Sequence, residues 1–151
     1  MSTIVAFLQL RFIPRNVHIA LLLLRLWLGG SMLLLHGLTK LRTFSDLSGK
    51  FPDPLGIGHP ASLALAIFGE VVCSALVILG LFTRLASLGL AINMGVAFFL
   101  VHSGVLTGEK NGELAFIYMA GYVTLLIAGG GVFSLDSAAY EPPLNTRSTT
   151  T

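Results

Sequence analysis

Residues 61–81 read ASLALAIFGEVVCSALVILGL, a run of about 20 residues in which Glu70 is the only charged side chain, and this length crosses the hydrocarbon core of a bilayer as one helix. Similar runs occupy residues 17–38, 85–103 and 114–133. None of them shows the period-two alternation of a membrane β-strand. The sequence therefore predicts an all-α fold, a polytopic membrane protein with four transmembrane helices in an antiparallel bundle.

The four runs define a simple domain organisation. We assign residues 1–136 to one transmembrane domain and residues 137–151, which are polar and rich in threonine, to a disordered tail. Residues 4–15 predict a short helix at the membrane interface that stops near Pro14. An even number of helices places both termini on one side. We expect the bacterial inner membrane with cytoplasmic termini, although basic residues are shared evenly between the two sides.

Composition narrows the functional classes. The chain is 54% hydrophobic and 11% charged, whereas soluble domains carry about a quarter charged residues. Its surface therefore requires a lipid bilayer as partner. The basic residues are scattered, so no nucleic-acid partner is expected. Cys73 is the only cysteine, which excludes a disulfide or a dithiol site within one chain.

Polar residues inside the apolar runs are costly and therefore informative. Counting about 1.5 Å per residue from the helix ends places Arg25, Glu70, Asn93 and Tyr122 at a similar depth. We expect these residues to form a buried polar layer in which Arg25 and Glu70 make an ion pair supported by Asn93. The pair has two interpretations: a clamp that sets helix register, or a part in substrate or proton chemistry.

A second polar layer is expected at the loop side of the bundle, as a possible ligand-binding site, from residues near the helix ends: His36, Lys40, Tyr118, His102 and Glu113. On ideal helices, His102 and Glu113 point away from the faces of Asn93 and Tyr122. Two histidines without a third ligand at motif spacing do not define a metal site, and we assign none. No nucleophile–base pair or phosphate-binding loop is present, so the catalytic residues, if any, are unknown.

The order of several short motifs resembles the DoxX family of small bacterial four-helix membrane proteins. Each motif alone is weak, whereas the ordered set is specific. The motifs are Leu24-Arg25-Leu26, His36-Gly37-Leu38-Thr39-Lys40, Glu70, Gly80-Leu81-Phe82-Thr83-Arg84-Leu85-Ala86, Gly112-Glu113-Leu114-Ala115 and Gly131-Val132-Phe133-Ser134-Leu135-Asp136. The sequence departs from the pattern at Gly130, where similar proteins often carry proline.

The resemblance implies a membrane component associated with redox physiology. Relatives include the membrane subunit of an archaeal thiosulfate:quinone oxidoreductase and proteins tied to oxidative, thiol or quinone stress. The polar positions that carry over are Arg25, His36, Lys40, Glu70, Arg84 and Glu113. A family likeness alone does not make the chain an enzyme.

Three hypotheses follow. The first is a redox-associated protein that binds a quinone-like ligand or anchors a soluble oxidoreductase subunit, with no cofactor held within the chain itself. The second is a structural scaffold or assembly factor whose buried ion pair is purely architectural. The third is a small proton-coupled transporter, which would require a homodimer to form a pathway.

Overall fold

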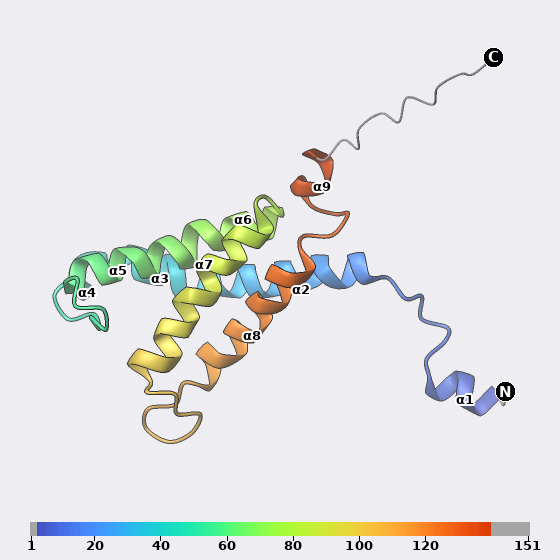
Figure 1. The fold of residues 1–151 in the computed structure, drawn as a ribbon, viewed down its shortest axis with the longest axis horizontal. Helices are drawn as coiled ribbons and strands as arrows, with labels where there is room; N and C mark the ends of the chain where they lie inside the picture. The colour runs from blue at the N-terminus through green and yellow to red at the C-terminus, as the bar shows by residue number, and fades with distance from the viewer. Residues whose placement is uncertain (1–2, 140–151) are drawn as a thin grey trace, which may run out of the picture.

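The computed structural model describes residues 3–139, and this part of the chain is helical without any strand (Figure 1). Three α-helices continue through π-helical segments, which are labelled η. The elements are α1 (Thr3–Leu8), α2 (Val17–Ser31), η1 (Met32–Gly37), α3 (Leu38–Arg42), α4 (Phe44–Leu47), α5 (His59–Ile67), η2 (Phe68–Cys73), α6 (Ser74–Leu79), α7 (Thr83–Val96), η3 (Ala97–Val101), α8 (Glu113–Ala128) and α9 (Leu135–Ala139).

Three continuous helices of the described chain are long and apolar enough to cross a membrane: Val17–Arg42, His59–Leu79 and Thr83–Val101. The fourth apolar helix, α8, has 16 residues and falls below the length of a typical span. The prediction of an all-α protein with membrane-spanning helices is thus confirmed for the described residues. A fourth crossing by α8 stays a prediction.

Local sequence explains where the long helices begin and end. The side chain of Asn16 accepts hydrogen bonds from the backbone amides of His18 and Ile19, at 3.0 and 3.1 Å, and so caps the start of α2. Gly80, with a φ of 71°, ends α6 in the left-handed conformation that glycine adopts without strain. Gly129, with a φ of 74°, ends α8 at Ala128, whereas the sequence predicted a helix up to Phe133.

Other predicted boundaries also shift. The first long helix continues to Arg42 instead of ending at Leu38, because η1 keeps the helix unbroken through the predicted end. Residues 137–139 belong to α9 instead of a disordered tail, and the remainder of that predicted tail, residues 140–151, lies outside the described residues.

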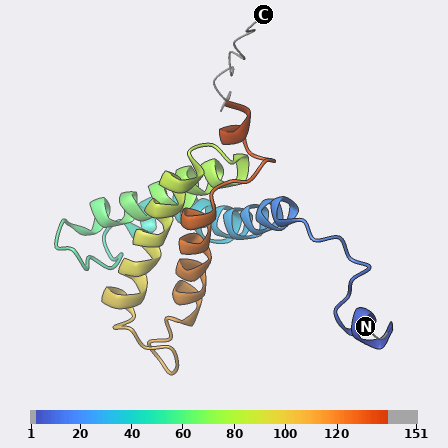
Figure 2. The ribbon, with the colours of Figure 1, turned by 45° about the vertical axis from the view of Figure 1, so that its right-hand side comes forward.

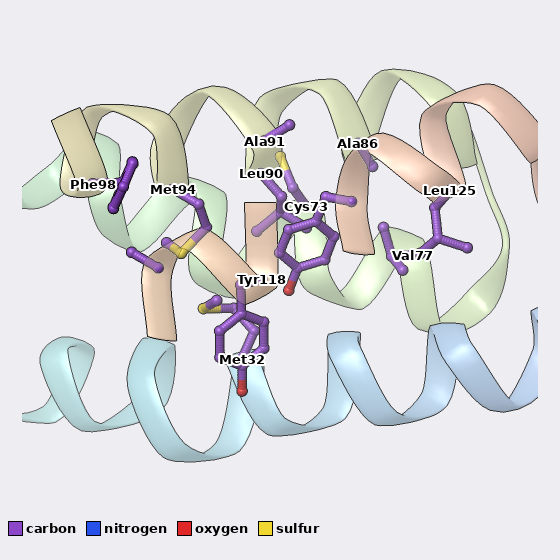
Figure 3. Close-up of a cluster of buried hydrophobic side chains, with 12 residues drawn as sticks. Met32, Cys73, Val77, Ala86, Leu90, Ala91, Met94, Phe98, Tyr118 and Leu125 are labelled. Carbon is purple, nitrogen blue, oxygen red and sulfur yellow. The ribbon is translucent and has the colours of Figure 1, made fainter. Parts of the chain in front are cut away.

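The long helices share one apolar core. α7 packs along α8 and against α6, while α2 packs against α6 and α8. Figure 3 shows side chains from these helices meeting at the centre, where Met32, Val77, Leu90, Tyr122 and Leu125 are fully buried. A small residue allows close packing between α2 and α8: a Cβ atom at Gly121 would lie 2.5 Å from Leu28 Cδ1, so the Leu28 side chain packs directly on the α8 backbone.

Candidate ligand-binding site

A cavity of about 400 Å³ lies between the helix His59–Leu79 and the helix Thr83–Val101, and the loop residues 51–55 form part of its wall. This volume falls within the range of small-molecule pockets, about 300 to 1,000 Å³. The lining is mostly apolar and includes outward-facing residues of both helices, namely Leu65, Phe68 and Ile92, each more than half exposed. The polar groups of the lining are Lys40, Ser62, Glu70, Asn93 and His102.

An ion pair between Lys40 and Glu70 forms one side of this cavity. Lys40 Nζ lies 2.5 Å from Oε1 and 2.7 Å from Oε2 of Glu70. The side chain of Glu70 is 4% exposed and that of Lys40 is 24% exposed. Burying a carboxylate this deeply is costly unless an opposite charge is paired with it. The close approach of η1 to η2 requires Gly37, since a Cβ atom there would lie 2.6 Å from the carbonyl oxygen of Glu70.

The predicted Arg25–Glu70 ion pair is wrong. Arg25 is fully buried near the C-terminal end of α6, away from Glu70. Its Nη2 donates a hydrogen bond of 2.5 Å to the Phe133 carbonyl, and a Cβ atom at Gly80 would overlap its Nη1. The prediction counted depth from the end of each helix and assumed that all helix ends lie at the same height in the membrane. In the structure, α2 begins beyond the end of α6 (Figure 1), so Arg25 faces Gly80 and the Glu70 level is reached only near Gly37.

Asp136 completes the environment of Arg25. Its carboxylate accepts hydrogen bonds from the backbone amides of Phe82 and Thr83, at 2.7 and 2.8 Å, and thereby caps the start of α7. Its own amide donates to the Gly80 carbonyl at 2.9 Å. Burial alone would raise the pKa of Asp136, but the Thr83 hydroxyl, these two amides and the Arg25 charge together hold it below its ordinary value.

The other two members of the predicted deep layer separate. Asn93 lines the cavity beside Glu70, and its Nδ2 donates a hydrogen bond of 3.2 Å to the Ala66 carbonyl. Tyr122 lies in the core instead, where its hydroxyl donates to the Leu28 carbonyl at 3.0 Å. The predicted deep layer is therefore divided: Arg25 lies near Gly80, Glu70 and Asn93 line the cavity, and Tyr122 lies in the apolar core.

The predicted loop-side layer also divides. Lys40 and His102 line the cavity, whereas Glu113 is exposed at the start of α8. The His36 ring packs edge-on against Tyr118, with ring centroids 5.9 Å apart, and the Tyr118 hydroxyl donates to Ser31 Oγ at 2.8 Å. Among the described residues, no three His, Cys, Asp or Glu side chains gather as potential metal ligands.

Sequence reasoning missed Asp53, which shapes the loop wall of the cavity. Its carboxylate accepts hydrogen bonds from the Ser62 hydroxyl at 2.7 Å and from the amides of Ile57 and Gly58 at 3.1 and 2.8 Å. The Ser62 hydroxyl makes the largest contribution to lowering the pKa of Asp53. An Asp-Pro step followed by two glycines is a turn signal that could have identified this role.

Comparison with known proteins assigns the family. The DoxX family model matches residues 20–103, more than half of the chain. The chain belongs to the DoxX family. A Haemophilus influenzae protein named only as uncharacterized is 32% identical over 119 residues, which cover 73% of this chain and 84% of that relative. A second uncharacterized protein of the same organism is 31% identical over 98 residues, covering 62% of this chain and 64% of the relative. No solved structure matches the chain at a significant level.

The residues matched by the DoxX family model include the cavity. Every lining residue of the cavity, from Lys40 to His102, falls within the matched residues, whereas Tyr118, Glu113 and Asp136 lie outside them. The three π-helical segments of the described residues are also located near the cavity: η2 carries Glu70, η3 ends next to His102, and η1 leads into α3, which carries Lys40. Such segments occur frequently at functional sites.

Proposed function

We propose that this DoxX protein is a redox-associated component of the bacterial inner membrane, with four crossings and cytoplasmic termini, that binds an uncharged quinone-like molecule in the cavity. The observation that carries the proposal is an apolar cavity of about 400 Å³ with an ion pair between the buried Glu70 and the partly buried Lys40 on one side. Apolar walls with a few polar groups are typical of sites for small organic ligands.

The charge of the cavity favours a neutral ligand. Because both carboxylate oxygens of Glu70 contact Lys40 Nζ, the pair carries no net charge. An ammonium has three donors, and a quinone carbonyl is a suitable acceptor for a donor that Glu70 does not use. The Asn93 amide and the His102 ring supply further polar groups to the cavity lining. A phosphate or a free carboxylate would bring an unpaired charge into the same apolar space.

The outward-facing wall suits a ligand that carries an apolar tail. Leu65, Phe68 and Ile92 lie on membrane-spanning helices, line the cavity and remain more than half exposed. A tail attached to a ring in the cavity would therefore run along these side chains into the lipid. Electrons for such a ligand would come from a soluble oxidoreductase, and anchoring that partner is the other part of the proposed role.

The test is binding of a decyl-substituted benzoquinone to protein reconstituted in nanodiscs, followed by calorimetry. Saturable binding is expected for the wild type. Removal of a charged hydrogen-bond donor in Lys40→Gln should weaken it about 10- to 100-fold. The matched control is Arg42→Gln, which removes an exposed cation on the same helix, α3, and should leave binding unchanged.

Two further variants keep the test independent of the ion pair, because Lys40→Gln also affects folding. Asn93→Leu and His102→Leu remove polar groups from the cavity wall and should each weaken binding up to about tenfold. The proposal fails if the wild type shows no saturable binding, or if all three cavity variants bind the quinone as the wild type does.

The other two hypotheses have less support. The scaffold hypothesis relied on an Arg25–Glu70 pair that does not form. The transporter hypothesis relied on a membrane carboxylate, and Glu70 is neutralised by Lys40. The hydroxyl groups of Tyr122 and Ser31 donate to backbone carbonyls, which cannot pass a proton onward.

A further inference from the structure

Residues 3–15 stand away from the helix bundle, as Figures 1 and 2 both show. This lead-in segment consists of α1 and the chain that joins it to α2. Its large apolar side chains are open to the surroundings: Ile4 is 70%, Phe7 68%, Leu8 74% and Phe12 68% exposed. Several neighbouring exposed apolar side chains on a soluble surface would be unfavourable, so this segment indicates contact with another apolar phase.

The covalent connection of the lead-in segment limits what that phase is. Only Asn16 separates it from Val17, the first residue of a helix long and apolar enough to cross a membrane. The segment is therefore held at the surface where that helix enters the lipid. In α1, Ile4, Phe7 and Leu8 follow the spacing of one helical face. A short helix with one apolar face can lie in the plane of the interface, with that face buried about 5 to 10 Å into the boundary between headgroups and acyl chains.

The charge of the segment selects the kind of lipid. Residues 1–45 contain no aspartate or glutamate, whereas Arg11 and Arg15 lie within the lead-in segment. Arg11 Nε donates a hydrogen bond to Gln9 Oε1 at 2.9 Å, so this guanidinium lies beside another polar group of the segment. Each basic residue near an anionic bilayer strengthens attachment about fivefold at moderate ionic strength.

We propose that residues 3–15 bind an anionic membrane surface, with Phe7, Leu8 and their apolar neighbours among the upper acyl chains and with Arg11 and Arg15 at the lipid phosphates. The lead-in segment then fixes the angle and depth at which α2 enters the bilayer. The occupant of its apolar face is the bilayer that holds the bundle. This role is separate from the cavity and does not depend on a quinone.

Spin-label accessibility of the full chain in vesicles tests the proposal. Cys73 is the only cysteine, so Cys73→Ser gives a background in which single labels are introduced. Leu8→Cys reports on the lead-in segment, Leu26→Cys on the lipid-facing side of α2, and Glu109→Cys on the exposed polar loop before α8. The ratio of a label's accessibility to oxygen to its accessibility to a water-soluble nickel chelate gives the depth of that label.

In vesicles with one third anionic lipid, the Leu8 label should lie between the deep Leu26 label and the aqueous Glu109 label. The double change Arg11→Gln with Arg15→Gln should lower the ratio of membrane-bound to free Leu8 label about 25-fold. The depth of the Leu26 label should not change. Raising the salt to 1 M should act in the same direction.

Two results would overturn the proposal. One is a Leu8 label as accessible to the nickel chelate as the Glu109 label, since the segment would then be in water. The other is spin–spin broadening of the Leu8 label that disappears on dilution with unlabelled protein. That result would show a second copy, not lipid, covering the apolar face.

Discussion

Removing the lysine of the buried ion pair gives the sharpest test of the structure. Lys40→Met leaves the Glu70 carboxylate, 4% exposed, without its partner. Breaking a buried pair by removing one member lowers the free energy of unfolding by about 3 to 5 kcal/mol. The assay is equilibrium unfolding of the purified protein in mixed micelles with increasing dodecyl sulfate, monitored by circular dichroism.

The opposite single change should be milder. Glu70→Leu leaves Lys40, whose side chain is 24% exposed and sits near the end of its helix, so the ammonium can extend toward the membrane surface. We expect a loss of about 1 to 2 kcal/mol. The double change, Lys40→Met with Glu70→Leu, should be more stable than Lys40→Met alone, since no unpaired charge remains.

A second double change serves as the control. Arg25 and Glu70 belong to separate clusters, so the effects of Arg25→Leu and Glu70→Leu should add within about 0.5 kcal/mol. Equal losses in the two single variants of the Lys40–Glu70 pair, with no coupling between them, would refute the pairing. Strong coupling between Arg25 and Glu70 would instead support the pair that the sequence suggested.

Three further predictions concern the packing and polar contacts of the bundle. Gly80→Ala should destabilise the protein by more than about 2 kcal/mol in the same unfolding assay, because the new Cβ would overlap the buried Arg25 at a positive φ, whereas Gly49→Ala, with open space around it, should change stability by less than about 1 kcal/mol. Asp136 has a lowered pKa, so its contribution to stability is fully present above its ordinary pKa of about 3.9 and is lost as the pH falls through the folded-state pKa. The stability difference between the wild type and Asp136→Asn should therefore shrink when unfolding is measured from pH 6 down to pH 3; a constant difference would contradict the assigned contacts. Tyr122→Phe removes one hydrogen bond to a backbone carbonyl and should lower the unfolding free energy by about 0.5 to 1.5 kcal/mol, with no change in the circular dichroism spectrum.

Sequence reasoning predicted which polar residues belong to the candidate site better than it predicted which of them contact each other. The cost of polar groups in lipid singled out Glu70, Asn93 and His102, and the position of Lys40 near a helix end placed it in the predicted loop-side layer; all four line the cavity. The partner of Glu70 was assigned incorrectly, because a depth count along each helix needs the relative axial position of the helices. Only packing sets that position.

Tertiary contacts that join distant segments were also beyond prediction. Asp136 caps α7 across a long stretch of chain, and this contact exists only because Gly129 ends α8 early and the chain returns over Arg25. The role of Asp53 was detectable as a turn signal, but not its place on a cavity wall.

The sequence by itself determined the solvent and the secondary structure of this protein. Long apolar runs that lack the period-two alternation of barrel strands can satisfy their backbone groups in lipid only as helices, whatever their neighbours are. The tertiary structure decided which polar groups meet. Ion pairing depends on distances of a few ångströms. Those distances follow from the axial position of the helix containing Lys40 relative to the helix containing Glu70, which is set where Gly37 allows the two backbones to come into contact.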